Sequence, residues 1–197
     1  MKIVFASTSP TRRKFVSQAG LEFEFASPVG AKELTGGLPP EELVKQNALN
    51  KALAVAEKKE NCLVIGCDTV VFFGGKIIGK PRDGEHAKKI LLELGGNWHE
   101  ILTGVAVVEC GSGKKLVEVE STRVKFKKVG GKQIDEYVES GEPLGKAGAY
   151  AVQEKGGFLV EKIEGSYSNI VGAPLEKIVG MLKQFGVEIS LGKRGVG

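Results

Sequence analysis

Short apolar runs alternate with helical segments along this chain and are twice joined by hairpins, and this pattern constrains the fold most. Residues 62–80 read CLVIGCDTVVFFGGKIIGK, which predicts a buried strand, a Gly-Gly hairpin and a return strand. Residues 99–110 and 115–129 predict two more strands, joined by the turn GSGK. Because hairpins interrupt the alternation of strands and helices, the sequence predicts an α/β fold with a mixed sheet, not a purely parallel, doubly wound one.

The other elements follow from periodicity and from residues that start or stop helices. Further strands are expected at 2–6, 21–27 and 157–163. Helices are expected from Pro10 to a stop at Gly20, over 40–59, from a cap at Asp83 to near Gly95, over 133–140, and from Pro174 onward. No linker divides the chain cleanly, so we expect one domain over residues 1–197, with a frayed, glycine-rich end at about 192–197.

Charge and cysteine content limit the class of protein. The net charge of +4 suits an anionic small molecule as well as nucleic acid, and it is not concentrated in one arm, so no disordered nucleic-acid tail is expected. The three cysteines form no C-x-x-C pair, which favours free thiols in a reducing compartment. The N-terminus lacks a signal-peptide pattern and no apolar run is long enough to span a bilayer. We therefore expect a cytoplasmic enzyme or binding protein without a membrane partner.

The first candidate site is the segment ASTSPTRR, which directly follows the first strand. The first residues of a helix present backbone N–H groups without intrahelical partners, and the hydroxyls of Ser7 and Ser9 add further donors. Arg12 and Arg13 add charge and forked guanidinium groups. These features predict a phosphate-binding loop. The alternative is a Ser-Pro helix cap followed by two solvated arginines.

The second candidate is Asp68, a carboxylate within the apolar run VIGCDTVVFF. Burying a carboxylate without a partner is costly, and ligands of α/β sheets bind at strand ends. Such an Asp can hold a divalent cation or deprotonate a water molecule; the alternative is an Asp bonded to a turn. Lys80 in GKPRD lies a dozen residues further on, where it either contacts a phosphate or is a surface charge.

Weaker candidates are spread along the chain. Lys51 lies one helical turn from Asn47, but most helical lysines are simply solvated. Gln153 follows the small residues of KAGAYAV and has the donor and acceptor that the edge of a nucleobase requires. Glu33 lies in a loop from which it can join Asp68 on a cation. Ser166, Ser168 and Asn169 precede the last helix, where capping is the favoured role, and His86, His99 and Trp98 are not assigned to a site.

Taken together, these motifs resemble the Maf nucleotide pyrophosphatases. The resemblance rests on ASTSPTRR, the loop acid Glu33, Lys51 in its helix, GCDTVV, GKPRD, TGVAV, GEPLGKAGAYAVQ and GSYSNIVGAPL, in that order along nearly the whole chain. It implies a three-layer α/β fold related to inosine triphosphatases, with a cleft between two lobes. It also implies hydrolysis of nucleoside triphosphates to monophosphate and pyrophosphate with Mg²⁺ or Mn²⁺, and no stable nucleic-acid complex. A homodimer is plausible by the same resemblance.

The resemblance also assigns roles to individual residues. Asp68 matches the catalytic proton acceptor and, with Glu33, the metal-binding acids. The substrate-binding positions it implies are Ser7, Ser9, Arg12, Arg13, Lys51, Lys80, Thr69 and Gln153. Thr69 and Gln153 match positions linked to substrate choice, and KAGAYAVQ resembles the branch that acts on dTTP and UTP. Thr11 stands where the family usually has the first arginine of a pair, also tied to specificity, and Arg13 is the residue available to compensate.

Two alternatives remain open from the sequence. The nearer one is an enzyme of the inosine triphosphatase type, which would prefer purine nucleotides and remove modified ones. The more distant one is a non-catalytic module that binds nucleotides or RNA. The acidic Asp68 beside a cationic cluster argues against this second alternative, because a pure phosphate binder loses affinity there.

Overall fold

The computed structural model describes residues 1–189 and 191 of the chain. The predicted frayed end at 192–197 lies outside the described residues. The strands are β1 (Lys2–Ala6), β2 (Glu24–Ala26), β3 (Cys62–Phe73), β4 (Lys76–Ile78), β5 (Trp98–Glu109), β6 (Lys115–Phe126) and β7 (Val160–Glu164). The α-helices are α1 (Pro10–Gln18), α2 (Pro40–Ala56), α3 (Gly84–Leu94), α4 (Gly131–Glu139), α5 (Tyr167–Ile170) and α6 (Leu175–Lys183), and two short 3-10 helices span Ala147–Ala149 and Lys155–Leu159.

Over the described residues, seven strands form one mixed sheet in the order β2-β1-β3-β5-β6-β7, with β4 paired to β3. β1 pairs in parallel with β2 and with β3, so that Val4 lies opposite both Glu24 and Val64. β4 returns antiparallel along β3, and β7 antiparallel along β6. The turn between β3 and β4 uses Gly74 and Gly75, both with positive φ, as a tight hairpin requires. The predicted mixed sheet and Gly-Gly hairpin are confirmed.

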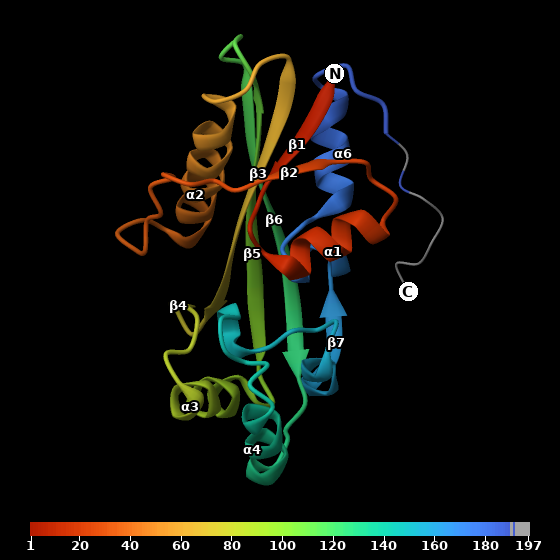
Figure 1. Cartoon of the computed structure of the whole chain (residues 1–197). Coiled ribbons are helices and arrows are strands. Elements are labelled where there is room, and N and C mark those ends of the chain that lie inside the picture. The colour runs from red at the N-terminus through yellow and green to blue at the C-terminus, as the bar shows by residue number, and fades with distance from the viewer. Residues whose placement is uncertain (190, 192–197) are drawn as a thin grey trace. The chain divides into compact units, whose positions relative to one another are not determined.

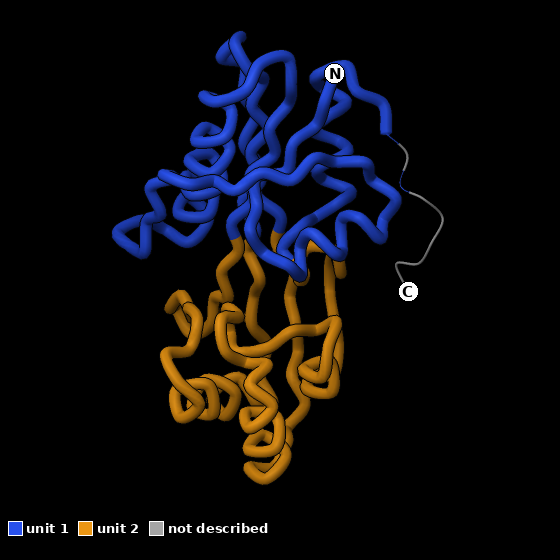
Figure 2. Tube along the Cα trace, in the orientation of Figure 1, with its two compact units in different colours: residues 1–68, 103–120, 172–197 blue, residues 69–102, 121–171 orange. Residues whose placement is uncertain are grey.

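The chain divides into two compact units (Figure 2). Unit 1 comprises residues 1–68, 103–120 and 172–197, and unit 2 comprises residues 69–102 and 121–171. Strands β3, β5 and β6 contribute residues to both units. The assignment of 1–197 to one domain stays a prediction, and each unit is described by itself below.

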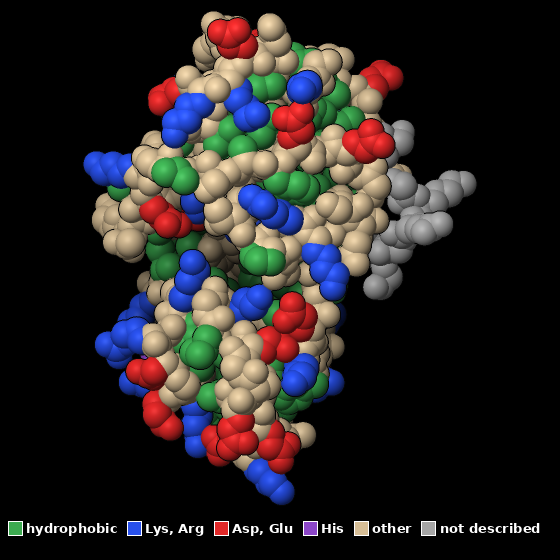
Figure 3. Space-filling view, viewed as in Figure 1, with side chains coloured by type: hydrophobic (Ala, Val, Ile, Leu, Met, Phe, Trp, Pro, Cys, Tyr) green, Lys and Arg blue, Asp and Glu red, His purple; other side chains and the backbone are tan. Residues whose placement is uncertain are grey.

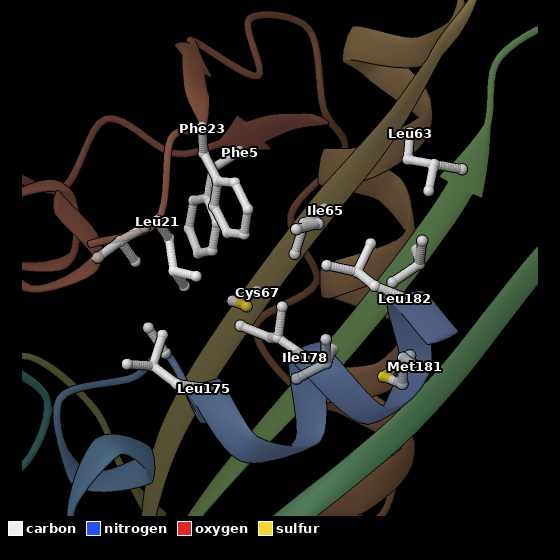
Figure 4. Close-up of a cluster of buried hydrophobic side chains, with 14 residues drawn as sticks. Phe5, Leu21, Phe23, Leu63, Ile65, Cys67, Leu175, Ile178, Met181 and Leu182 are labelled. Carbon is white, nitrogen blue, oxygen red and sulfur yellow. The ribbon is translucent and has the colours of Figure 1, made fainter. Parts of the chain in front are cut away.

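Unit 1 has three layers, because the side chains of its strands alternate between two buried faces. Phe5, Ile65 and Val107 pack with α1 and α6, and Figure 4 shows this cluster, in which the rings of Phe5 and Phe23 are stacked. The alternate residues, such as Val64 and Ala106, pack with α2 on the opposite face. In Figure 1, α2 accordingly lies on one side of these strands and α1 and α6 lie on the other.

Two strand glycines let α2 approach the sheet closely. A Cβ atom at Gly66 in β3 would lie 2.2 Å from the carbonyl oxygen of Ala48, and one at Gly104 in β5 would lie 2.1 Å from that of Val44. Such distances are far below van der Waals contact and the neighbouring atoms are backbone, so no side chain fits at either position. The two glycines therefore set the distance between α2 and the sheet.

Unit 2 has its own apolar core, which α3 and α4 build with parts of β3, β5 and β6. As predicted, Asp83 caps α3, and its Oδ1 accepts from the backbone N–H of His86 at 2.7 Å. His99 is only 2% exposed: its Nε2 lies 2.9 Å from the Tyr150 hydroxyl, and its ring packs edge-on against Phe126 and Tyr150. Burial lowers the pKa of His99 to about 4.

His99 predicts a pH dependence of stability. Its pKa rises from about 4 in the folded chain to about 6.5 on unfolding, so the unfolded state takes up the proton first as the pH falls. This contribution is complete above pH 6.5 and is lost between pH 6.5 and pH 4, by up to about 3 kcal/mol. We expect urea unfolding to show a smaller loss on acidification for His99→Gln than for the wild type. An equal loss in both would contradict this, and His86→Gln on α3 is the matched control.

Several predicted boundaries were wrong: the strand predicted at 115–129 ends at Phe126 and the helix predicted over 133–140 spans Gly131–Glu139. Three others were wrong for a local reason. The strand predicted at 21–27 is only β2, because the N–H of Phe23 donates to the carbonyl of Leu21 in a tight turn. The helix predicted to 59 ends at Ala56, where the chain continues in hydrogen bonds of the tighter i to i−3 type. The strand predicted at 157–163 begins only at Val160, after a 3-10 helix.

Cysteine and membrane predictions are also testable. Cys62, Cys67 and Cys110 are free, as predicted. The first two are buried, whereas Cys110 is only half-buried. Among the described helices, none combines the length and the apolar character needed to cross a bilayer.

Candidate active site

The loop between β1 and α1 is built from paired hydroxyls. The Ser7 Oγ accepts from the backbone N–H of Ser9 at 3.2 Å, and the Ser9 Oγ caps α1 by accepting from the N–H of Arg12 at 3.4 Å. The predicted Ser-Pro cap is therefore present. Because each hydroxyl serves as an acceptor in these contacts, its own hydrogen stays available to donate to an anion.

Both arginines of this segment also contact the backbone of unit 1. Arg12 Nη1 donates to the carbonyl oxygen of Cys67 at 3.2 Å, which brings the guanidinium to the residue preceding Asp68. Arg13 Nε donates to the carbonyl of Ser7 at 2.8 Å, and its guanidinium lies over the Phe25 ring. These contacts hold the two arginines at the loop in place of leaving them fully solvated.

Asp68 lies where β3 faces the polar side of α2. It is only 7% exposed, and both carboxylate oxygens have partners on the helix. Lys51 Nζ donates to Oδ1 at 2.6 Å and Asn47 Nδ2 donates to Oδ2 at 3.0 Å. A charged and a neutral donor hold this buried carboxylate in a fixed orientation, and each oxygen retains a second lone pair.

The same face of α2 holds the loop that carries Glu33. Lys51 Nζ also contacts Glu33 Oε1 at 3.0 Å, so one ammonium group lies between two carboxylates. Asn47 exchanges two hydrogen bonds with the backbone of Leu34, at 2.7 and 2.9 Å, and Asn50 donates to the carbonyl of Lys32. The spacing of 47, 50 and 51 places these side chains on one helical face.

Glu33 and Asp68 both contact the Lys51 ammonium group, so the same two carboxylates are the candidate ligands of a divalent cation. Carboxylate oxygens are the ligands Mg²⁺ prefers, and Mg²⁺ is commonly held by one or two carboxylates together with substrate phosphates. Within residues 1–189 and 191, no cluster of three or more His, Cys, Asp or Glu side chains is arranged to hold a metal by itself. The donor set therefore fits a cation that arrives with a phosphate ligand.

Cys67 precedes Asp68 but does not fit the role of a nucleophile. Its side chain belongs to the apolar cluster under α1 and α6 (Figure 4). Burial raises the pKa of the Cys67 thiol to about 12, although Arg12 and Lys51 oppose this shift. A thiol that stays protonated at neutral pH is not a nucleophile, so the chemistry of this site rests on oxygen.

The other predicted residues lie in unit 2. Lys80 is exposed and follows β4. The carbonyl of Gly79, the residue before Lys80, accepts a hydrogen bond from the N–H of Gly148 at 3.2 Å. That bond joins the GKPRD and KAGAYAVQ motifs. Gln153 is half-buried at a turn, and within the described part of unit 2 its side chain forms no hydrogen bond. Its amide is therefore available to a ligand.

Comparison with known proteins identifies the family. The family described as Maf-like protein matches residues 2–185. This chain is a member of that family. Among curated Maf-like relatives, a dTTP/UTP pyrophosphatase of Pelotomaculum thermopropionicum is 46% identical over 188 residues, covering 95% of this chain and 98% of the relative. A dTTP/UTP pyrophosphatase of Dictyoglomus thermophilum is 43% identical over 189 residues, with 95% and 98% coverage.

Solved structures agree with the Maf-like fold. A HAM1 protein from Coxiella burnetii superposes with a TM-score of 0.53 at 16% identity, covering 93% of this chain and 99% of that one. The Staphylococcus aureus Ham1 protein gives a TM-score of 0.50 at 13% identity, with 94% and 97% coverage. At these identities the likeness concerns the fold alone.

In this Maf-like chain, unit 1 thus brings together Ser7, Ser9, Arg12, Arg13, Glu33, Lys51 and Asp68, whereas Thr69, Lys80 and Gln153 belong to unit 2. Thr11 is half-buried in the first turn of α1. Asn47 was named only as a neighbour of Lys51, yet it orients both Asp68 and the Glu33 loop. Its spacing of one helical turn from Lys51 is the signal that points to it. Ser166 caps the short helix α5 by accepting from the N–H of Asn169. The last helix, α6, has Pro174 at its cap position and no side-chain cap, so the predicted capping role holds for Ser166 alone and for a different helix.

Proposed function

We propose that this Maf-like protein hydrolyses dTTP and UTP to the nucleoside monophosphate and pyrophosphate. The observation that carries the proposal is the buried Asp68, which Lys51 and Asn47 hold in a fixed orientation while Arg12 binds the neighbouring carbonyl. The names of the curated relatives, at 41–46% identity over nearly the whole chain, support dTTP and UTP as substrates.

The basic groups bind the triphosphate. The hydroxyls of Ser7 and Ser9, with Arg12 and Arg13, donate to phosphate oxygens at the start of α1. Lys51 and Lys80 offset the charge of the pyrophosphate leaving group. Holding several positive groups close together costs free energy in the empty site. In the bound state, the same groups lower the charge repulsion around the reacting phosphorus.

Asp68 and Glu33 would hold a Mg²⁺ or Mn²⁺ ion that enters with the substrate. When bound, the ion polarises phosphate oxygens and offsets their charge. Asp68 accepts a proton from the attacking water and directs that water to the α-phosphorus. Asn47 keeps the Asp68 carboxylate oriented, because it binds Oδ2 and leaves the second lone pairs of both oxygens open to water and cation.

Nucleobase choice falls to unit 2 and to the first turn of α1. The amide of Gln153 forms hydrogen bonds with O4 and N3–H of uracil or thymine. Thr69 and Thr11 also contribute to the preference for the nucleobase. A cytosine would place a donor against a donor, which costs roughly 1–3 kcal/mol for an unpaired buried polar group.

Gln153→Ala is expected to reduce base preference more than rate. The ratio of kcat/KM for UTP over CTP should fall by roughly tenfold, since one unmatched hydrogen bond costs about 1.4 kcal/mol. Steady-state kinetics with both nucleotides measure this ratio. Gln133→Ala, at an exposed position of α4, is the matched control. An unchanged ratio would remove Gln153 from base reading.

A panel of common and modified triphosphates, each incubated with Mg²⁺, tests the function as a whole. We expect pyrophosphate and monophosphate from dTTP and UTP foremost. Preferred hydrolysis of ITP would indicate the purine alternative, and binding without any product would indicate a non-catalytic module. On the face drawn in Figure 3, basic and acidic side chains lie intermixed, which suits a small ligand better than a nucleic acid. We place the activity in the cytoplasm, since the three thiols are free.

A further inference from the structure

In unit 2, a carboxylate and a phenol that are hydrogen-bonded to each other hold the two ends of the loop that carries Gln153. At the far end of the loop, the backbone N–H of Lys155 donates to Glu142 Oε2 at 3.1 Å, and that of Gly156 donates to Glu142 Oε1 at 2.9 Å. Hydrogen bonds to an ionised acceptor are about twice as strong as neutral ones. Glu142 therefore fixes the point at which the loop returns.

Tyr137 on α4 holds the near end of the loop. Its hydroxyl donates to Glu142 Oε1 at 2.8 Å and accepts from the backbone N–H of Ala151 at 3.3 Å. Burial, followed by the hydrogen bond to Glu142, raises the pKa of Tyr137, so the phenol keeps the proton that it donates. The phenol thus links the start of the loop to the carboxylate that binds its end.

The two ends of the loop also contact each other closely. A Cβ atom at Gly156 would lie 2.5 Å from the Tyr137 hydroxyl oxygen and 2.9 Å from both N and O of Ala151. Only a glycine allows the returning chain to pack against Ala151 and the phenol at once. The loop between these ends is therefore short and closed, with Gln153 at its turn.

We propose that Glu142 and Tyr137 are positioning residues for nucleobase selection, which hold the loop of Gln153 so that its amide meets the base edge in one orientation. The inference rests on the proposed function. It adds two residues that hold the Gln153 loop in place, a role that the sequence motifs alone do not identify. The Gln153 amide discriminates between bases only if it cannot rotate or shift to form hydrogen bonds with the wrong base. The rigidity of the loop therefore contributes to base specificity.

The substitutions Tyr137→Phe and Glu142→Gln test the proposal. Phenylalanine keeps the ring of Tyr137 in the core but loses both hydrogen bonds of the hydroxyl. Glutamine offers an NH₂ group where a carboxylate oxygen accepts a backbone N–H, so one end of the loop is released. Glu139→Gln, an exposed position on α4, is the matched control.

The measurement is kcat and KM for UTP and CTP with the full chain. We expect the ratio of kcat/KM for UTP over CTP to fall by roughly fivefold or more in both variants, about 1 kcal/mol of discrimination. The change should come from a higher KM for UTP with kcat within about twofold of the wild type, as expected for lost uniform binding. A residue that only stabilises the fold would not move this ratio.

The outcomes separate the two proposals. If the wild type prefers UTP and both variants keep its ratio, the positioning role is wrong while the proposed function stands. If the wild type releases no pyrophosphate from UTP or dTTP, the proposed function is wrong and the role of Glu142 and Tyr137 in it falls too. Amide hydrogen exchange of residues 151–156 checks the loop directly: faster exchange in folded Tyr137→Phe supports the clamp, and unchanged exchange contradicts it even if Glu142→Gln fails to fold.

Discussion

Replacing Asp68 by Asn is expected to lower the turnover of dTTP by about a hundredfold or more, since general-base catalysis contributes that much. The asparagine has nearly the same shape, but it cannot accept the proton of the attacking water and is a weaker ligand for a cation. It also turns an ion pair of 2.6 Å with Lys51 into a hydrogen bond to a neutral group. The binding of dTTP should change much less than its turnover.

Asp135→Asn is the matched control, because Asp135 also pairs with a lysine, Lys88, but lies on α4 with its side chain 44% exposed. Circular dichroism and urea unfolding establish that both variants are folded. Turnover by Asp68→Asn close to the wild-type value would mean that Asp68 is not the base, whatever its burial indicates.

Gly66→Ala is the second substitution with a large expected effect. Its Cβ would lie 2.2 Å from the Ala48 carbonyl, so α2 must move away from β3. Overpacking of this kind costs roughly 1–3 kcal/mol of stability. Asn47 precedes Ala48 on α2 and Lys51 follows it by about one helical turn, so the shift also loosens both contacts with Asp68. A displacement of about 1 Å can reduce the rate by about a hundredfold, so we expect a tenfold to hundredfold loss of turnover.

Gly180→Ala is the matched control for this prediction. Gly180 lies on the exposed side of α6, and an added Cβ would meet no atom within 4 Å. There, alanine should raise the free energy of unfolding by up to about 1 kcal/mol, because glycine is the poorer helix former. If Gly66→Ala were as stable and as active as Gly180→Ala, the close approach of α2 would not be what positions Lys51 and Asn47.

The elements of the fold were predictable where local chemistry determines them. Paired glycines specify the hairpin between β3 and β4, and Asp83 specifies the start of α3, because each satisfies a requirement of the backbone within a few residues. Boundaries failed where a local turn interrupts the expected periodicity: the N–H of Phe23 donates to the carbonyl of Leu21, so β2 begins only at Glu24.

The candidate site was predictable in its residue types but not in its supports. A carboxylate in an apolar strand and a serine- and arginine-rich loop are visible in the sequence. That Asn47 binds both Asp68 and Leu34 is not visible, because it depends on how closely α2 packs on the sheet. The same holds for Tyr137 and Glu142, whose partners Ala151 and Gly156 lie more than ten residues away along the chain.

Hydrolysis of dTTP in water labelled with heavy oxygen tests the central claim most directly, because the label reports which phosphorus the water attacks. If Asp68 directs water to the α-phosphorus, mass spectrometry will find the label in the thymidine monophosphate and none in the pyrophosphate. Label in the pyrophosphate, or release of orthophosphate with a nucleoside diphosphate, would contradict the account.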